Sequence, residues 1–153
     1  MAVYQPRPAA PGDAGVLFRI HRESMGDYLA QAFGPWTEDF AREQHGKWLR
    51  AGRAQAVMMD GQIVGALDIE WQPDAAILSR IEIDPKFQGR GVGSAIVQDL
   101  LRQCAERRVP ARLHVFSRNP AHRLYQRLGF RDQGHASPSI AMQWDPPGDP
   151  WLR

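Results

Sequence analysis

A glycine-rich turn is the part of this sequence whose residue types and spacing are best suited to chemistry. A short apolar run at 81–83 ends at Pro85, and glycines follow at positions 89, 91 and 93, where a long amphipathic segment begins. This order predicts a strand, a tight loop and a helix start. Glycine allows close approach of the backbone to a ligand, and the first N–H groups of a helix lack partners within it. The turn is therefore a candidate site for the phosphate groups of a cofactor.

Two common phosphate-binding loops do not match this turn. A Walker loop needs Gly-Lys followed by Ser or Thr, and the sequence contains no such triplet. The dinucleotide fingerprint needs Gly-x-Gly-x-x-Gly after an early strand, whereas these glycines lie past the middle of the chain. A turn and helix start without any ligand would also explain three glycines, so a second pattern has to decide.

The second pattern lies at residues 119–130, after a short apolar run. Asn119 is a good helix cap, and Pro120 suits the first position of a helix. Apolar residues then share one helix face, and Gly129 supplies a C-terminal stop. The segment predicts a strand, a short helix and a sharp helix end.

Together the two patterns, Gln88-x-x-Gly91-x-Gly93 and Asn-Pro-Ala-x-x-Leu-Tyr-x-x-Leu-Gly-Phe, closely resemble the GNAT superfamily of N-acetyltransferases. The resemblance is specific over residues 76–131. It implies acetyl coenzyme A (acetyl-CoA) as co-substrate, no metal, and a primary amine of a small molecule or peptide as acceptor. A non-catalytic acyl-CoA-binding sensor and a nucleotide-binding or phosphate-binding module of another fold are the alternatives.

The resemblance also assigns the cofactor-binding residues. The pyrophosphate is expected against the loop, with the Ser94 hydroxyl as an extra donor; the loop residues are Gln88, Gly89, Arg90, Gly91, Val92, Gly93 and Ser94. Main-chain groups of Ile81 and Ile83 are expected to pair with the pantetheine amides, as an added strand would. Asn119 either contacts the pantetheine arm or only caps its helix. Arg123 could reach a terminal phosphate or simply face water.

Tyr125 is the expected general acid. In the resembled family the matching tyrosine hydroxyl lies near the thioester sulfur, where it can protonate the departing thiolate. Tyr125 also falls on the apolar face of its helix, and a packing role alone would explain it.

Glu82 is the expected general base, acting on the amine directly or through water. Its position between two isoleucines directs its side chain to the opposite face of the strand from theirs. A salt bridge with Arg80 or Lys86 would explain Glu82 equally well. Glu70 and then Asp68 are the next candidates, since the family has no universal base.

The remaining sequence predicts one domain over residues 1–153. The dipeptide Asp60-Gly61 between two apolar runs indicates a hairpin. Asp13 and Thr37 are candidate caps for two helices. Strands are expected at 3–7, 57–59, 63–69, 76–83, 113–116, 130–135 and 139–144, and helices at about 13–30, 37–50, 91–107 and 120–128. An irregular tail is expected from about residue 145.

This order of elements is the one expected of the resembled family. The implied fold is α/β (α+β), with a mixed, mostly antiparallel sheet and helices on both faces. The strands that carry Ile81 and Val115 are expected to form a central parallel pair that splays apart.

Composition agrees with a small intracellular enzyme, and a cytoplasmic location is expected. The net charge is +2 with no basic block, so nucleic-acid binding is not expected. No apolar run approaches the roughly 20 residues of a membrane span, and the N-terminal sequence lacks a secretory apolar core. Cys104 is the one cysteine, which suits a reducing compartment. A homodimer is compatible with the resemblance.

Overall fold

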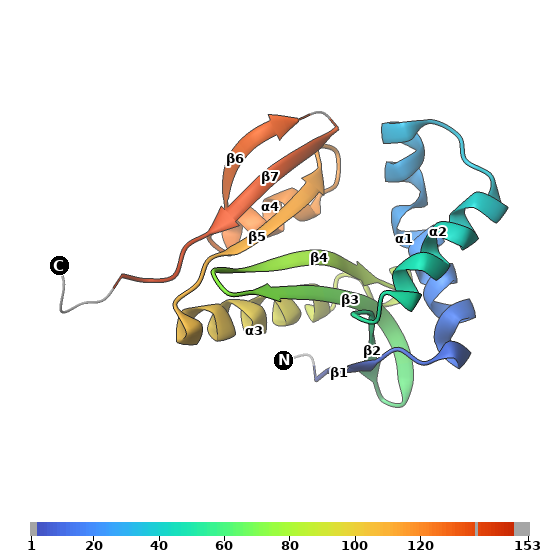
Figure 1. Cartoon of the computed structure of the whole chain (residues 1–153), viewed down its shortest axis with the longest axis horizontal. Coiled ribbons are helices and arrows are strands. Elements are labelled where there is room, and N and C mark those ends of the chain that lie inside the picture. Colours follow the sequence, from blue (N-terminus) through green and yellow to red (C-terminus); the bar gives the residue numbers. More distant parts are fainter. Residues whose placement is uncertain (1–2, 137, 149–153) are drawn as a thin grey trace. The chain divides into compact units, whose positions relative to one another are not determined.

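The computed structural model of the chain describes residues 3–136 and 138–148 (Figure 1). The chain divides into two compact units. The first unit contains the described residues of Met1–Ile69 and Arg80–Gly93, and the second contains those of Glu70–Ser79 and Ser94–Arg153. Two long strands, β3 (Gln62–Gln72) and β4 (Ala75–Ile83), contribute residues to both units. The single domain predicted from the sequence stays a prediction.

Seven strands follow one another in the order β1-β2-β3-β4-β5-β7-β6. Residues 76–78 of β4 pair in parallel with 111–113 of β5 (Ala111–Phe116). The pairs β1–β2, β2–β3, β5–β7 and β6–β7 are antiparallel. This order confirms the mixed, mostly antiparallel sheet with one parallel pair. Splaying of that pair beyond residues 78 and 113 stays a prediction.

The first unit packs two helices with strands β1 (Gln5–Pro8), β2 (Gln55–Met59) and β3. Helix α1 (Ala14–Phe33) and helix α2 (Glu38–Arg50) are drawn in blue to cyan in Figure 1. Leu17 of α1 is fully buried together with Ala56 of β2 and Ala66 of β3. Small strand residues beneath a leucine allow the helix to lie close to the strands, which fixes the face that α1 turns towards them.

Local sequence signals set several ends in this unit. Asp60 and Gly61 both have positive φ, 49° and 77°, so they form the predicted two-residue hairpin turn. The Thr37 side chain accepts a hydrogen bond from the N–H of Phe40, which confirms it as the cap of α2. Helix α1 continues to Phe33, beyond the expected end near residue 30, and β1 begins two residues later than expected.

Asp13 lies at the N-cap position of α1, as expected, but the expected capping hydrogen bond is not formed. The carboxylate accepts instead from the N–H of Ala10 at 2.7 Å and from both terminal nitrogens of Arg7 at 2.7 and 2.9 Å. These bonds lower the pKa of Asp13 to about 2, with the Arg7 contribution the largest. The charged partner outcompetes the helix N–H groups because a bidentate guanidinium bond is the stronger interaction.

The second unit contains β5, α4 (Ala121–Arg127), β6 (Arg131–Ala136), β7 (Ser139–Trp144) and most of helix α3 (Val92–Arg107). In Figure 1, β5, β7 and β6 lie side by side with α4 behind them. Buried Leu113 and Val115 alternate with exposed Arg112 and His114 along β5, as in a half-buried strand. Residues 145–148 have no regular structure, and the rest of the expected irregular tail lies outside the described residues.

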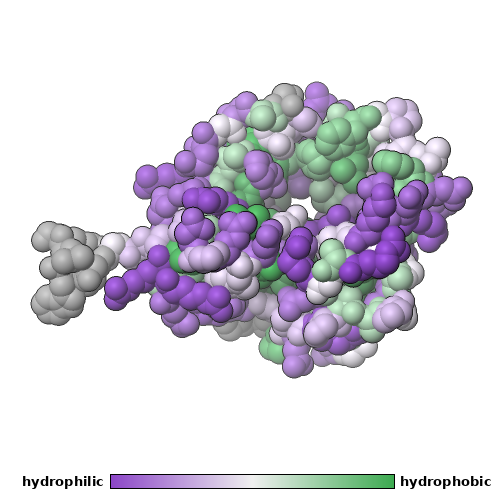
Figure 2. Space-filling model, in the orientation of Figure 1, coloured by the Kyte–Doolittle hydropathy of each residue, from purple (hydrophilic) through white to green (hydrophobic). Residues whose placement is uncertain are grey.

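Hydrophilic residues gather over α2 on the face shown in Figure 2, in keeping with the polar sequence of that helix. Among the described residues, no helix has the length and apolar character needed to cross a membrane. The same part of the chain has no group of three or more His, Cys, Asp or Glu side chains placed to hold a metal ion.

Candidate functional site

The glycine-rich turn lies between β4 and α3, as predicted. β4 ends at Ile83, a short 3-10 helix η2 (Pro85–Phe87) follows, and α3 begins at Val92. Gly89 and Gly91 have φ of 78° and 81°. Residues that carry a Cβ are strained in this backbone conformation, whereas glycine adopts it readily. The loop thus needs glycine at these two positions for its backbone path, and it leads directly into the N-terminal N–H groups of α3.

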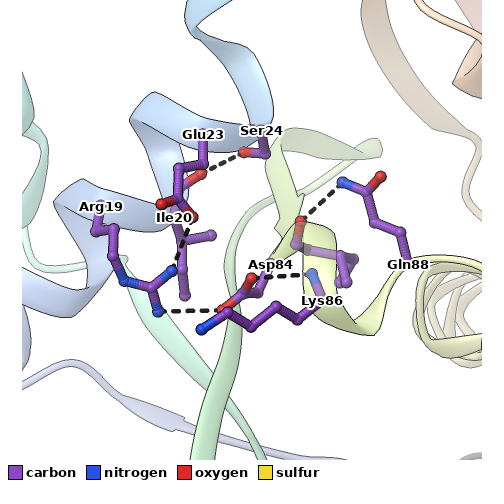
Figure 3. A network of polar contacts seen from close by, with 8 residues as sticks. Arg19, Ile20, Glu23, Ser24, Asp84, Lys86 and Gln88 are labelled. Carbon is purple, nitrogen blue, oxygen red and sulfur yellow. Dashed lines mark hydrogen bonds and ion pairs between the residues drawn. The ribbon is translucent and has the colours of Figure 1, made fainter.

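Asp84 fixes the start of this loop (Figure 3). Its side chain is buried and accepts hydrogen bonds from the N–H of Lys86 and from Arg19 of α1, each at 3.1 Å. Burial raises the pKa of Asp84, but these hydrogen bonds and the positive charges outweigh burial, so the pKa is lowered overall. The carboxylate therefore stays ionised and ties the loop to α1.

Ile81 and Ile83 are both half-buried at the end of β4. The carbonyl of Ile83 accepts a hydrogen bond from the Gln88 side chain at 3.0 Å (Figure 3). The N–H of Gln88 is directed to the carbonyl of Pro85 at 3.4 Å. A carbonyl has two lone pairs, so the Ile83 oxygen keeps capacity for a second donor. Pairing of these strand residues with pantetheine stays a prediction.

The other loop residues divide into anchors and candidate donors. Val92 is 2% exposed, so its side chain anchors the helix and only its N–H can serve a ligand. The Ser94 oxygen accepts from the Gln98 side chain at 3.3 Å, which leaves its O–H free to donate. The guanidinium of Arg90 lies over the Phe87 ring, 5.1 Å from its centre. Phosphate binding by these residues stays a prediction.

Glu82 lies at the centre of a buried polar cluster in the first unit. It is 4% exposed, and its Oε2 lies 2.6 Å from Nδ1 of His21 in α1. Its Oε1 is buried and has no hydrogen-bond partner within the described part of the chain. Arg80, one of the salt-bridge partners considered from the sequence, places a guanidinium nitrogen 3.9 Å from Oε1. The structure therefore supplies an ion-pair partner and also leaves one carboxylate oxygen without a hydrogen bond.

Aromatic rings support this cluster. The His45 ring of α2 lies 5.3 Å from that of His21 and 5.2 Å from that of Trp48, measured between ring centres. The pKa of His45 is lowered to about 4: burial is the largest cause, interactions with His21 and Arg80 act in the same direction, and Glu82 acts in the opposite direction. His45 is therefore neutral at pH 7. Arg80 lies over the Trp48 ring at 4.1 Å.

The two other candidate bases have different surroundings. Asp68 is 1% exposed and accepts hydrogen bonds from Trp48 at 2.7 Å and from Arg53 at 3.0 Å. Both oxygens of Asp68 are thus engaged by protein donors, which favours a structural role. Glu70 is half-buried and belongs to the second unit. Of the three carboxylates, Glu82 is the one with a buried oxygen that has no hydrogen-bond partner in the part of the chain that the structure describes.

Tyr125 lies in the second unit and is 6% exposed. Its ring packs edge-on against Phe130, with ring centres 5.8 Å apart. Burial raises the pKa of Tyr125 to about 12, so the phenol keeps its proton at neutral pH. Gly129, at φ 103°, ends the helix as predicted, and the N–H of Phe130 returns to the carbonyl of Tyr125 at 3.0 Å. This turn fixes the Tyr125 backbone.

Asn119 and Arg123 flank the start of α4. The Asn119 side chain accepts from the N–H of Ala121 at 2.9 Å, but it does so from the position before the helix cap, so the expectation that Asn119 is the cap was wrong. The helix begins at Ala121, so Pro120 lies one position before it, not at its first position. Arg123 is exposed. Contacts of Asn119 with pantetheine and of Arg123 with a phosphate stay predictions.

His21 and His45 are the candidate site residues that the sequence did not reveal. His21 and Glu82 are 61 positions apart and meet only through the packing of α1 with β4. A histidine next to a buried isoleucine on an amphipathic helix is a weak signal, because such residues often lie at the edge of a core.

The chain has a mixed sheet with a parallel β4–β5 pair, and a glycine-rich loop joins β4 to α3. This is the fold class of the N-acetyltransferases. The family model described as "Acetyltransferase (GNAT) family" matches residues 18–130, and the chain belongs to this family.

Two curated relatives carry the name mycothiol acetyltransferase. The protein from Acidothermus cellulolyticus is 31% identical over 147 residues, covering 84% of this chain and 44% of the relative. The protein from Thermomonospora curvata is 31% identical over 129 residues, covering 81% of this chain and 43% of the relative. The chain thus spans less than half the length of both relatives.

A solved structure has the same fold. The PaiA N-acetyltransferase from Thermoplasma acidophilum, determined in complex with coenzyme A, superposes with a TM-score of 0.74 at 17% identity. The superposition covers 94% of this chain and 99% of that chain.

Proposed function

We propose that this protein transfers the acetyl group of acetyl-CoA to a primary amine of a small molecule or peptide, by direct attack of the amine on the thioester. The proposal depends on one observation, which concerns a continuous segment of the first unit. In it, a buried glutamate lies six positions before the first residue of the glycine-rich loop, and one of its oxygens has no hydrogen-bond partner among the described residues. Family membership supplies the acetyl chemistry.

The loop residues would bind the diphosphate of the co-substrate. The left-handed backbone at Gly89 and Gly91 turns the chain into the start of α3, where N–H groups without helical partners favour negative charge. The Ser94 hydroxyl can add one donor. Main-chain groups of Ile81 and Ile83 would hold the pantetheine amides in the manner of an added strand.

Glu82 and Tyr125 would handle the two protons. An alkylamine must lose a proton to attack, and Glu82 Oε1 would take that proton directly or through one water. The new C–N bond forms as the C–S bond breaks, and Tyr125 would give its proton to the departing sulfur. The extra proton on the new amide nitrogen would then leave to the tyrosinate, directly or through water. Burial raises the pKa of Tyr125 to about 12, so the phenol carries a proton to give at neutral pH.

The relatives suggest a first acceptor to test. Because both are named mycothiol acetyltransferases, mycothiol without its acetyl group is the first amine to try. Glycinamide, glucosamine, cysteine amide and spermidine complete a panel of small, sugar, thiol-bearing and cationic amines. Coenzyme A release would be followed by chromatography, because a thiol-bearing acceptor interferes with thiol reagents. Coenzyme A binding without acetylation of any amine in this panel would favour the sensor.

Replacing Tyr125 with Phe tests the acid. We expect Tyr125→Phe to lower kcat by about 100-fold or more, the usual effect of losing a proton donor, with the Kd for coenzyme A unchanged. Tyr4→Phe is the control, since it removes a hydroxyl from the N-terminal segment. The measurements are steady-state kinetics and calorimetry with coenzyme A. Turnover of Tyr125→Phe at the wild-type rate would remove the phenol from the mechanism.

A further inference from the structure

We infer that His21 is a positioning residue for Glu82, and this inference rests on the function proposed above. The two side chains come from different elements, α1 and β4, and meet at 2.6 Å. Helix and strand thus converge on one carboxylate, whose second oxygen, Oε1, has no hydrogen-bond partner within the described residues.

The chemistry of the pair places the hydrogen on His21. An ionised carboxylate can only accept, so the contact between Nδ1 and Oε2 requires a proton on Nδ1. A terminal nitrogen of Arg80 also lies near Nδ1, but at 3.4 Å, and guanidinium cannot accept a proton in turn. The shorter contact with the carboxylate therefore determines the tautomer, and Arg80 rests on the Trp48 ring instead.

This hydrogen bond selects one orientation of the carboxylate. The terminal torsion of a glutamate has a broad, roughly two-fold energy profile, so an unsupported carboxylate samples many orientations. His21 holds Oε2, so Oε1, which has no hydrogen-bond partner within the described residues, is the oxygen left to take a proton. In the proposed step the amine N–H bond breaks and an O–H bond forms at Oε1, while the proton on His21 Nδ1 stays in place.

The surroundings of His21 suit a residue that orients the Glu82 carboxylate better than one that transfers a proton to solvent. The His21 side chain is 15% exposed, against 3% for Glu82. On the α2 side it meets the His45 ring, which burial keeps neutral at pH 7 and which therefore adds no charge. On the β4 side it meets Arg80 and Glu82, whose charges are opposite. The imidazole of His21 thus lies between the neutral His45 ring and the oppositely charged side chains of Arg80 and Glu82.

Three variants separate positioning from other roles. His21→Leu removes the donor, and we expect kcat to fall roughly 10-fold or more, with KM for acetyl-CoA unchanged. In His21→Asn the side-chain amide can donate to Oε2 in place of Nδ1, and we expect it to recover most of that loss. His135→Asn is the matched control, because this β6 histidine has a side chain 67% exposed. The assay uses acetyl-CoA and the most active amine of the panel above.

The outcomes distinguish this inference from the proposed function. If His21→Asn is as slow as His21→Leu, the imidazole itself is required and the positioning role is wrong. If His21→Leu turns over at the wild-type rate, the positioning role is also wrong. Glu82→Gln tests the base separately. Wild-type turnover in Glu82→Gln would reject Glu82 as base, whatever the His21 variants show.

A spectroscopic readout tests the same contact without any acceptor. In protein labelled with ¹⁵N-histidine, the His21 ring should carry its proton on Nδ1, with a proton resonance shifted downfield by the short hydrogen bond. In Glu82→Gln that resonance should move upfield, because a neutral amide oxygen is a weaker acceptor than a carboxylate. A His21 ring protonated on Nε2 alone would overturn the inference, even if the leucine variant does not fold.

Discussion

His45 shows how the environment of one residue couples protonation to stability. The side chain is 3% exposed, and burial holds its pKa near 4, against an ordinary value of 6.5. The unfolded chain therefore binds this proton more readily than the folded protein does. The folded state keeps its full stability above pH 6.5 and loses part of it as the pH falls towards 4, by about 3 kcal/mol at most.

Replacing His45 with Phe should remove this acid sensitivity. The new ring has Phe18 and Trp48 as aromatic neighbours and has no group to protonate. We expect the free energy of unfolding to fall less between pH 6.5 and 4 than in the wild type. Urea unfolding at several pH values measures this difference, with His135→Gln as the exposed control. Equal slopes for wild type and His45→Phe would show that another group causes the acid sensitivity.

At the scale of elements, Gly65 determines how closely β3 approaches β4. A Cβ at this position would lie 2.4 Å from the carbonyl oxygen of Glu82 and 3.1 Å from Cδ1 of Ile83. The first atom is backbone, so one strand would have to move. The glycine thus sets the position of the strand segment that carries the candidate base.

Gly65→Ala should therefore destabilise the protein and disturb Glu82 at the same time. We expect a loss of about 1–3 kcal/mol in the free energy of unfolding, as for other overpacked sites. Gly134→Ala in β6 is the control, because a Cβ there meets nothing within 4 Å. Urea unfolding gives the stability, and kcat gives the effect on Glu82. If Gly65→Ala and Gly134→Ala are equally stable, the close approach of β3 to β4 at Gly65 is contradicted.

Elements set by short-range signals were predictable from the sequence. The Asp60-Gly61 turn, the Thr37 cap and the helix end at Gly129 each depend on neighbours within a few positions. The bonding of Asp13 was not predictable, because Arg7 lies on β1 and competes with the helix for the carboxylate. Local chemistry fixes such an end only where no charged partner from another element intervenes.

The candidate site divides in the same way. The glycine-rich loop and Tyr125 follow from spacing along the chain, and Glu82 follows from alternation in a strand. The pairing of Glu82 with His21 could not be predicted, because the two residues are 61 positions apart and meet only when their elements pack together. Spacing along the chain therefore reveals site residues that lie in one continuous segment. It does not reveal a contact between residues of two distant segments.

At the scale of the whole molecule, ligand binding should raise stability by mass action. At 100 times its Kd, coenzyme A should add about 2.7 kcal/mol to the free energy of unfolding. Thermal unfolding with coenzyme A and with ATP, each at several concentrations, measures this effect. We expect coenzyme A to give the larger rise in Tm. A larger rise with ATP would favour a nucleotide-binding module over an acetyltransferase.

The family was predictable because its motifs lie in two continuous segments that the sequence displays directly. Other properties of the whole molecule have no such local signature. A homodimer and a cytoplasmic location stay predictions, since both depend on surfaces or surroundings beyond these segments.

The fixing of Asp84 by Arg19 and the Lys86 N–H has a consequence for how a ligand is received. The turn ahead of the glycines is pre-organised by bonds internal to the protein. The conformational entropy of that turn is therefore lost when the chain folds, not when a ligand arrives. Weak contacts from the loop amides can then suffice for affinity, because the ligand has little ordering of the turn left to impose.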